Sequence, residues 1–225
     1  MLISISGAQG SGKSTVLNEL KRIGFNVISR KTARSVLEEF DVKTLDEVYA
    51  NPDLVVKWQN LILERKVLDE FEAYHSEELW FTERTYADLF TYACMAVGKN
   101  NSKSDWLNSY YDRCQECQHK YHIHSFYIFH HGNYTATNDG VRGVNPQYAA
   151  MIETSMYYFL KAMSRNALNE NSITHYVPNF TDVESLVTEE RVKKIATVSI
   201  NKYLERINYH NPDTLNPDSM SRFST

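Results

Sequence analysis

The segment GAQGSGKST, residues 7–15, limits the folds open to this chain more than any other feature of its sequence. Its spacing fits the phosphate-binding pattern G-x-x-x-x-G-K-[ST], which is met by Gly7, Gly12, Lys13 and Ser14. The apolar residues 2–6 before it predict a buried strand, and residues 13–23 carry an apolar stripe of helical period. A strand, a glycine-rich loop and a helix in this order indicate an α/β fold that binds a phosphate chain.

The residue types of this loop predict its chemistry. Glycines let the main chain turn sharply and approach an anion closely, and unpaired amides at a helix start attract that anion. Lys13 is expected to reach the β- and γ-phosphates, and the Ser14 hydroxyl to ligate Mg²⁺. We therefore predict ATP and Mg²⁺ as cofactors. The nucleotide contacts are expected from Gly7, Gln9, Gly10, Ser11, Gly12, Lys13, Ser14 and Thr15.

Length and composition are typical of one α/β domain. Of the 225 residues, 42 % are hydrophobic, and no apolar run reaches the ~18 residues of a membrane helix. We predict a domain over residues 1–207 and a loose tail over 208–225, which holds prolines and no apolar face. Met1 leads directly into the first strand and the three cysteines are an odd number, so we expect no signal peptide and a cytoplasmic location.

Strand-like and helix-like segments alternate along the chain. Buried strands are predicted over residues 2–6, 25–29, 79–82, 126–129 and 173–177. Helices are predicted over residues 13–23, 32–40, 53–74, 86–97, 104–120, 147–163 and 183–207. This alternation predicts the three-layer fold of P-loop NTPases, with a five-stranded parallel sheet flanked by helices.

Charged residues follow the second and third predicted strands, where ligands bind in parallel sheets. The second strand leads to a cationic cluster of Arg30, Lys31 and Arg34. The third leads to Glu83, Arg84 and Asp88. Arg84 is expected to stabilise the transferring group or to orient the acceptor, unless it only pairs with Glu83. Glu83 or Asp88 would bind Mg²⁺ through water or accept a proton from the acceptor.

Two further residues are candidates for ligand contact. Arg142 lies in a polar, glycine-containing loop over residues 132–145, which we expect to close as a lid over the triphosphate. Asp139 would orient Arg142 or cap a turn. Gln59, on the long predicted helix, would bind a base or sugar, or face solvent.

Several of these motifs resemble known P-loop kinases. The run FTERTYADLFTYA, residues 81–93, resembles the acid-arginine segment of deoxynucleoside kinases. The chain also resembles P-loop proteins related to the ribosylnicotinamide kinase domain, a group often classed with AAA-type ATPases, and compact phage nucleotide kinases. The shared motifs, spread over residues 1–207, are GAQGSGKST, KTAR (31–34), Gln59, Glu83-Arg84 and DGVR (139–142). This resemblance implies transfer of a phosphoryl group to a nucleoside or nucleotide.

One position departs from the pattern of that group. Its members usually have a glutamate, able to act as general base, where this chain has Lys31 behind Arg30. The cluster of Arg30, Lys31 and Arg34 suits an acceptor that already bears phosphate. We therefore predict an anionic nucleotide-like acceptor, with the alternative that these side chains face solvent or pair with Glu38 and Glu39.

Other functions remain as alternatives. A kinase acting on a hydroxymethylated base or an end in DNA is disfavoured by the net charge of −4, although the basic cluster would serve it. A nucleotide-operated ATPase or GTPase switch would also use the loop, but we find no guanine-reading [NT]KxD motif. The sequence predicts no oligomeric state.

The spacing of Cys114, Cys117, His119, His122 and His124 invites a zinc site. The two cysteines fall within a predicted helix and the histidines run into a strand of alternating faces. We favour packing roles for these residues.

Overall fold

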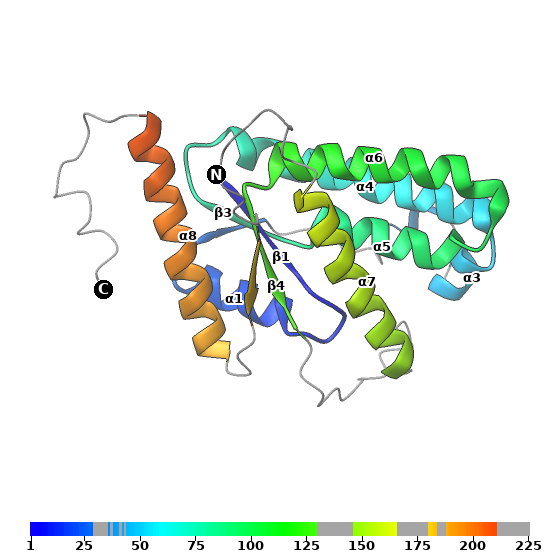
Figure 1. Cartoon of the computed structure of the whole chain (residues 1–225), viewed down its shortest axis with the longest axis horizontal. Helices are drawn as coiled ribbons and strands as arrows, with labels where there is room; N and C mark the ends of the chain where they lie inside the picture. Colours follow the sequence, from blue (N-terminus) through cyan, green and yellow to red (C-terminus); the bar gives the residue numbers. More distant parts are fainter. Residues whose placement is uncertain are drawn as a thin grey trace.

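The structure, a computed structural model, describes residues 1–28, 36, 38–40, 42, 44–129, 146–165, 180–183 and 188–210. In this part of the chain a five-stranded parallel sheet is flanked by helices on both faces (Figure 1). The strands are β1 (Leu2–Ser6), β2 (Asn26–Val27), β3 (Trp80–Glu83), β4 (His124–Ile128) and β5 (Phe180–Val183). Their order is β2-β3-β1-β4-β5, so β1 lies at the centre. β1 therefore has β3 on one side and β4 on the other, and the phosphate-binding loop follows β1 between these two strands.

The helices form two groups. They are α1 (Lys13–Arg22), α3 (Leu45–Tyr49), α4 (Pro52–His75), α5 (Tyr86–Val97), α6 (Ser104–Tyr121), α7 (Pro146–Arg165) and α8 (Thr188–His210). The short 3-10 turns are η1 (Glu38–Phe40) and η2 (Asn101–Lys103). Helices α1 and α8 pack together on one side of the sheet, and α4 to α7 gather on the other (Figure 1). None of the described helices is long and apolar enough to cross a bilayer.

The alternation of side chains along β1 explains this division. Ile3 and Ile5 point into an apolar core shared with α1 and α8. Leu2 points to the opposite face, into the core of α4 to α7. On that face Ser4 and Ser6 are fully buried, and the Ser4 and Ser125 hydroxyls are 2.7 Å apart. The central strand is therefore apolar towards one helical layer and partly polar towards the other.

Most predicted elements are confirmed within a few residues. The strand over residues 2–6 and the helix over 86–97 have the predicted bounds, and the parallel sheet has five strands. The helix predicted over 183–207 is wrong at its start, because Val183 belongs to β5 and pairs with Ile128 of β4. The predicted fifth strand at 173–177 lies outside the described residues, and β5 instead comprises Phe180–Val183. Helix α3 was not predicted.

Other expectations fall outside the described part of the chain. The predicted lid over residues 132–145 and most of the helix predicted over 32–40 are among them. The last helix, predicted to end at residue 207, continues to His210. The rest of the predicted tail, residues 211–225, also lies outside the described residues.

Gly7 joins β1 to the loop in a conformation that a side chain would disturb. Its φ is +144°, and a Cβ there would lie 2.4 Å from the Ile128 carbonyl oxygen of β4.

We expect Gly7→Ala to lower the free energy of unfolding by about 3 kcal/mol, from backbone strain and overpacking together. Gly24 has φ +101°, but no atom lies within 4 Å of the place that a Cβ would take, so Gly24→Ala should cost only about 1 kcal/mol. Urea unfolding followed by circular dichroism compares the two, and equal losses would contradict the steric argument.

Candidate functional site

The phosphate-binding loop is shaped by three glycines in backbone conformations that side chains avoid. Gly7, Gly10 and Gly12 have φ of +144°, +82° and +91°. Gly12 is the N-cap of α1 and offers no side chain to cap it, and the first turn of α1 contains no acidic residue. No N-cap side chain competes with an external anion at the first turn of α1, and the helix dipole favours an anion there.

Lys13 is held inside the loop by the main chain. Its Nζ donates to the carbonyl oxygens of Gly7 (2.7 Å) and Ala8 (2.8 Å), and the side chain is buried. Two carbonyl partners satisfy a charge that burial would otherwise penalise. The lysine is thus positioned by the loop that it is expected to serve.

Ser14 and Glu83 come together although they lie far apart in sequence. Parallel pairing of β1 with β3 sets Glu83 opposite Ile5, near the end of β1 that leads into the loop. The Ser14 hydroxyl donates to Glu83 Oε2 at 3.3 Å. A hydroxyl and a carboxylate are hard oxygen ligands of the kind that Mg²⁺ takes from proteins, with water and phosphate completing its shell. These two residues fit the predicted Mg²⁺ site.

Arg84 forms the turn between β3 and α5. It has φ +68°, the only positive φ of a non-glycine residue in the described part of the chain. Its amide donates to the Ile5 carbonyl (2.8 Å), and its half-buried guanidinium lies 5.1 Å from the centre of the Tyr92 ring. Burial acts to lower the pKa of Arg84, but Tyr92 and the nearby carboxylates of Glu83 and Asp88 raise it, so the cation persists.

Asp88 has a structural position. It is fully buried, and its Oδ1 accepts hydrogen bonds from Ser6 Oγ (2.5 Å) and Thr85 Oγ1 (2.7 Å). The Thr85 hydroxyl in turn accepts from the Asp88 amide (3.2 Å), so Thr85 caps the start of α5. Asp88 Oδ2 has no hydrogen-bond partner among the described residues. Glu83, not Asp88, is the carboxylate beside Ser14.

Only some of the remaining predicted site residues lie in the described part of the chain. Gln59 does not face solvent: it is buried between α4 and α6, where the Tyr110 hydroxyl donates to its backbone carbonyl (3.1 Å). Ser11 is buried in the loop, whereas Ser14 and Thr15 are exposed. Arg30, Lys31, Arg34, Asp139 and Arg142 lie outside the described residues.

Sequence reasoning missed Arg191, a cation at the phosphate-binding loop. Arg191 is in the first turn of α8 and is buried, with its guanidinium donating to the carbonyls of Ser11 (2.7 Å) and Phe129 (3.4 Å). A Cβ at Gly12 would lie 3.0 Å from the Arg191 guanidinium and would crowd it, so the glycine gives Arg191 room to approach the loop. The sequence Glu189-Glu190-Arg191 looks like a solvated helix face, and no local pattern signals a partner 180 residues away.

A second buried group also escaped prediction. Lys66 and Glu70 of α4 form a fully buried ion pair directly behind Arg84. His122, one of the residues whose spacing invites a zinc site, has its Nε2 3.0 Å from the Glu70 carboxylate. Within the described residues no group of cysteine, histidine and carboxylate side chains is arranged to hold a metal ion.

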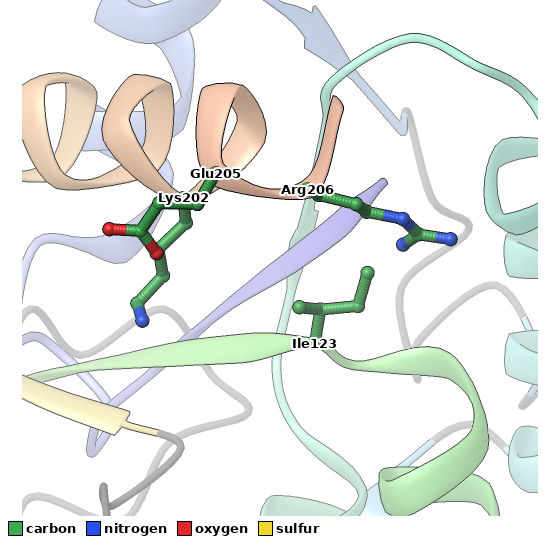
Figure 2. Close-up of a pocket in the computed structure, with 4 residues that line it drawn as sticks. All are labelled: Ile123, Lys202, Glu205 and Arg206. Carbon is green, nitrogen blue, oxygen red and sulfur yellow. The ribbon is translucent and has the colours of Figure 1, made fainter. Parts of the chain in front are cut away.

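A hollow of about 410 Å³ lies away from the loop (Figure 2). It is lined by Ile123, Lys202, Glu205 and Arg206. Ile123 precedes β4, so this hollow is at the amino ends of the strands, whereas the phosphate-binding loop follows the carboxyl end of β1. It is not part of the candidate site.

Arg191 gives a test of the loop. We expect Arg191→Met to weaken binding of Mg²⁺-ATP about tenfold, because the loop loses a charge-assisted hydrogen bond to the Ser11 carbonyl and a nearby positive charge. Lys193→Met removes the same charge from an exposed position on α8 and should leave the affinity unchanged. Isothermal titration calorimetry measures both, and equal affinities of the two variants would exclude a role for Arg191 in the loop.

Comparison with known proteins agrees with this fold. Deoxyadenosine kinase from M. mycoides, solved with the products dCMP and a flexible dCDP bound, has a similar fold, with a TM-score of 0.62, 18% identity, and coverage of 90% of this chain and 100% of that chain. NadR protein in complex with NAD and AMP-PNP gives a TM-score of 0.58 at 11% identity, covering 90% of this chain and 49% of that chain. No curated protein matches the sequence significantly. The model of the family described as AAA domain matches residues 2–176. This match spans more than half of the chain, so the chain belongs to the AAA domain family.

Proposed function

We propose that the protein is a kinase that transfers the γ-phosphoryl group of ATP to a hydroxyl of a nucleotide-like acceptor. The observation that carries this proposal is the meeting of Ser14 and Glu83 (3.3 Å) next to the loop that holds Lys13. Phosphoryl transfer needs little covalent chemistry from the protein and much neutralisation of charge. The glycine-rich loop at the start of α1, a buried lysine and a hydroxyl-carboxylate pair would supply that neutralisation.

Each residue has a role that follows from its position. Lys13 would move its ammonium from the Gly7 and Ala8 carbonyls to the β- and γ-phosphates, and the α1 amides would hold the phosphate oxygens. Ser14 and Glu83 would hold Mg²⁺, which would neutralise charge on the phosphates when bound. Arg84 would stabilise charge on the transferring group from the end of β3. From the sequence we add Arg142 as a cation that closes over the triphosphate.

The acceptor is proposed to be a nucleotide, in solution or within DNA. Proteins of similar fold were solved with dCMP and dCDP, and with dATP at 16% identity and a TM-score of 0.59, which supports a site for nucleosides and nucleotides. The cluster of Arg30, Lys31 and Arg34 argues for a phosphate already present on the acceptor. Neighbouring positive charges would attract such a phosphate and disfavour a neutral nucleoside only mildly.

Lys13→Ala tests the transfer reaction itself. We expect it to lower kcat/KM at least about 100-fold, because one preorganised cation at the phosphates is lost, while the melting temperature changes little. The assay incubates the protein with labelled ATP, Mg²⁺ and a panel of nucleosides, mononucleotides and DNA duplexes. Lys21→Ala, on an exposed position of α1, is the matched control. Hydrolysis of ATP that no acceptor accelerates would instead indicate a nucleotide-operated switch, and phosphorylation of DNA alone would indicate a polynucleotide kinase.

Lys31→Glu tests the charge of the acceptor. We expect kcat/KM for a mononucleotide acceptor to fall about tenfold, since an attraction to its phosphate becomes a repulsion, while the KM for ATP stays constant. Lys120→Glu makes the same charge change at an exposed position near the end of α6 and should have no effect. If Lys31→Glu leaves the mononucleotide kinetics intact, the cationic cluster is not the acceptor site.

A further inference from the structure

A buried ion pair underlies the turn that carries Glu83 and Arg84. Lys66 and Glu70, one helical turn apart on α4, are both 0% exposed and in contact with each other. Lys66 Nζ also donates to the Arg84 carbonyl oxygen (2.8 Å) and lies 3.4 Å from the Glu83 carbonyl oxygen. The ammonium therefore links α4 to the main chain at the end of β3.

Glu70 is fixed by partners from three other segments. Its carboxylate accepts hydrogen bonds from Thr82 Oγ1 of β3 (2.8 Å) and the Tyr86 hydroxyl of α5 (2.8 Å), and His122 Nε2 lies 3.0 Å away. Burial opposes the charge, but Lys66 and His122 outweigh it and lower the pKa of Glu70. Glu70 is thus an ionised anchor that fixes the position of Lys66.

The turn itself needs such support. Arg84 is the single residue between β3 and Thr85, the N-cap of α5, and its left-handed φ of +68° is unfavourable for a residue with a Cβ. Its amide continues the sheet by donating to the Ile5 carbonyl (2.8 Å), and its carbonyl is taken by Lys66. Both peptide groups of the strained residue are therefore held, one by the sheet and one by the ion pair.

A buried ion pair is an unusual way to fill a core. Replacing such a pair by apolar side chains of similar volume is often neutral or stabilising, so its presence is better explained by geometry than by stability. Strained backbone also persists at functional sites when the surroundings over-determine it. Both observations meet at Arg84, which borders the pair of Ser14 and Glu83.

We propose that Lys66, anchored by Glu70, is a positioning residue that locks Arg84 in its left-handed conformation, so that Glu83 meets Ser14 and the Arg84 guanidinium faces the Tyr92 side. This inference rests on the proposed kinase function for its catalytic consequence. It assigns neither Lys66 nor Glu70 a contact with ATP or acceptor. The pair acts through the main chain of residues 83 and 84.

The test removes the link and keeps part of the hydrogen bonding of the core. In Lys66→Met/Glu70→Gln both charges disappear together, and the introduced side-chain amide still offers its one carbonyl oxygen to one of the two hydroxyls, Thr82 or Tyr86, which donate to different oxygens of Glu70. We expect kcat to fall about 100-fold through misplacement of Glu83 and Arg84, while the KM for ATP changes less than about threefold. Thr91→Val, a buried polar substitution on α5 away from the turn, should leave kcat unchanged. An unchanged kcat in the double variant would overturn the proposal. A rise in the KM for ATP as large as the fall in kcat would also overturn it.

A double-mutant cycle separates positioning from general damage. In an Arg84→Ala background, adding Lys66→Met/Glu70→Gln should lower kcat by less than about tenfold, because much of the effect passes through the missing guanidinium. Losses that multiply fully would show that the pair acts independently of Arg84 and would overturn the proposal. If the double variant does not fold, Tyr86→Phe, which removes one donor to Glu70, replaces it; a lowered kcat at constant KM supports the proposal and an unchanged kcat contradicts it.

A readout without catalysis keeps the two proposals distinct. Hydrogen exchange at the Arg84 amide, which donates to Ile5, should be at least about tenfold faster in Lys66→Met/Glu70→Gln than in the wild type. If the wild type phosphorylates no acceptor, the kinase proposal fails, and the exchange rate still decides whether the ion pair holds the turn. Equal protection of the Arg84 amide in both proteins would show that it does not.

Discussion

The candidate site depends on the way β1 ends. The strand is fully buried and ends at Ser6, and Gly7 follows it with φ +144°, in a place where a side chain would collide with the Ile128 carbonyl of β4. The chain turns there, and the turn brings the first amides of α1 to the carboxyl edge of the sheet with no side-chain cap on the N-cap residue. Because these amides carry fixed partial charges, the site can attract an anion before any side chain moves. The other groups of the site are arranged around this main-chain feature.

Each side of β1 supports the loop differently. The face with Ile3 and Ile5 rests on the apolar core of α1 and α8, which also brings Arg191 to the Ser11 carbonyl. The opposite face presents Ser6 to Asp88, and so connects the end of β1 to the first turn of α5. The two helical layers, one apolar and one partly polar towards β1, therefore both support the short segment where β1 ends and the loop begins. A rigid loop with cations behind it and a carboxylate opposite is the arrangement that charge neutralisation during phosphoryl transfer requires.

Local patterns allowed much of this arrangement to be predicted. Spacing alone identified the loop, and apolar periodicity gave the bounds of β1 and α5, because these elements are encoded by neighbouring residues. Contacts between distant segments were not accessible in the same way. Arg191 follows two acidic residues and reads as solvent-facing, yet α8 carries it to Ser11. The strand predicted over residues 173–177 lies outside the described residues, and the strand at Phe180–Val183, which pairs with β4, was not signalled by local periodicity.

The residues that prediction missed share a physical character. Lys66, Glu70 and Arg191 are charged side chains that are buried against main-chain carbonyls or against each other, in places where apolar residues are expected. A charge in such a place costs free energy unless its partners are complete, and those partners come from strands and helices far away in the chain. All three lie beside the loop or the turn of Arg84 and none lies at the distant hollow near Ile123. Buried charge in this fold is thus concentrated where the main chain must hold one geometry, which is the expectation for a site that binds and neutralises phosphate.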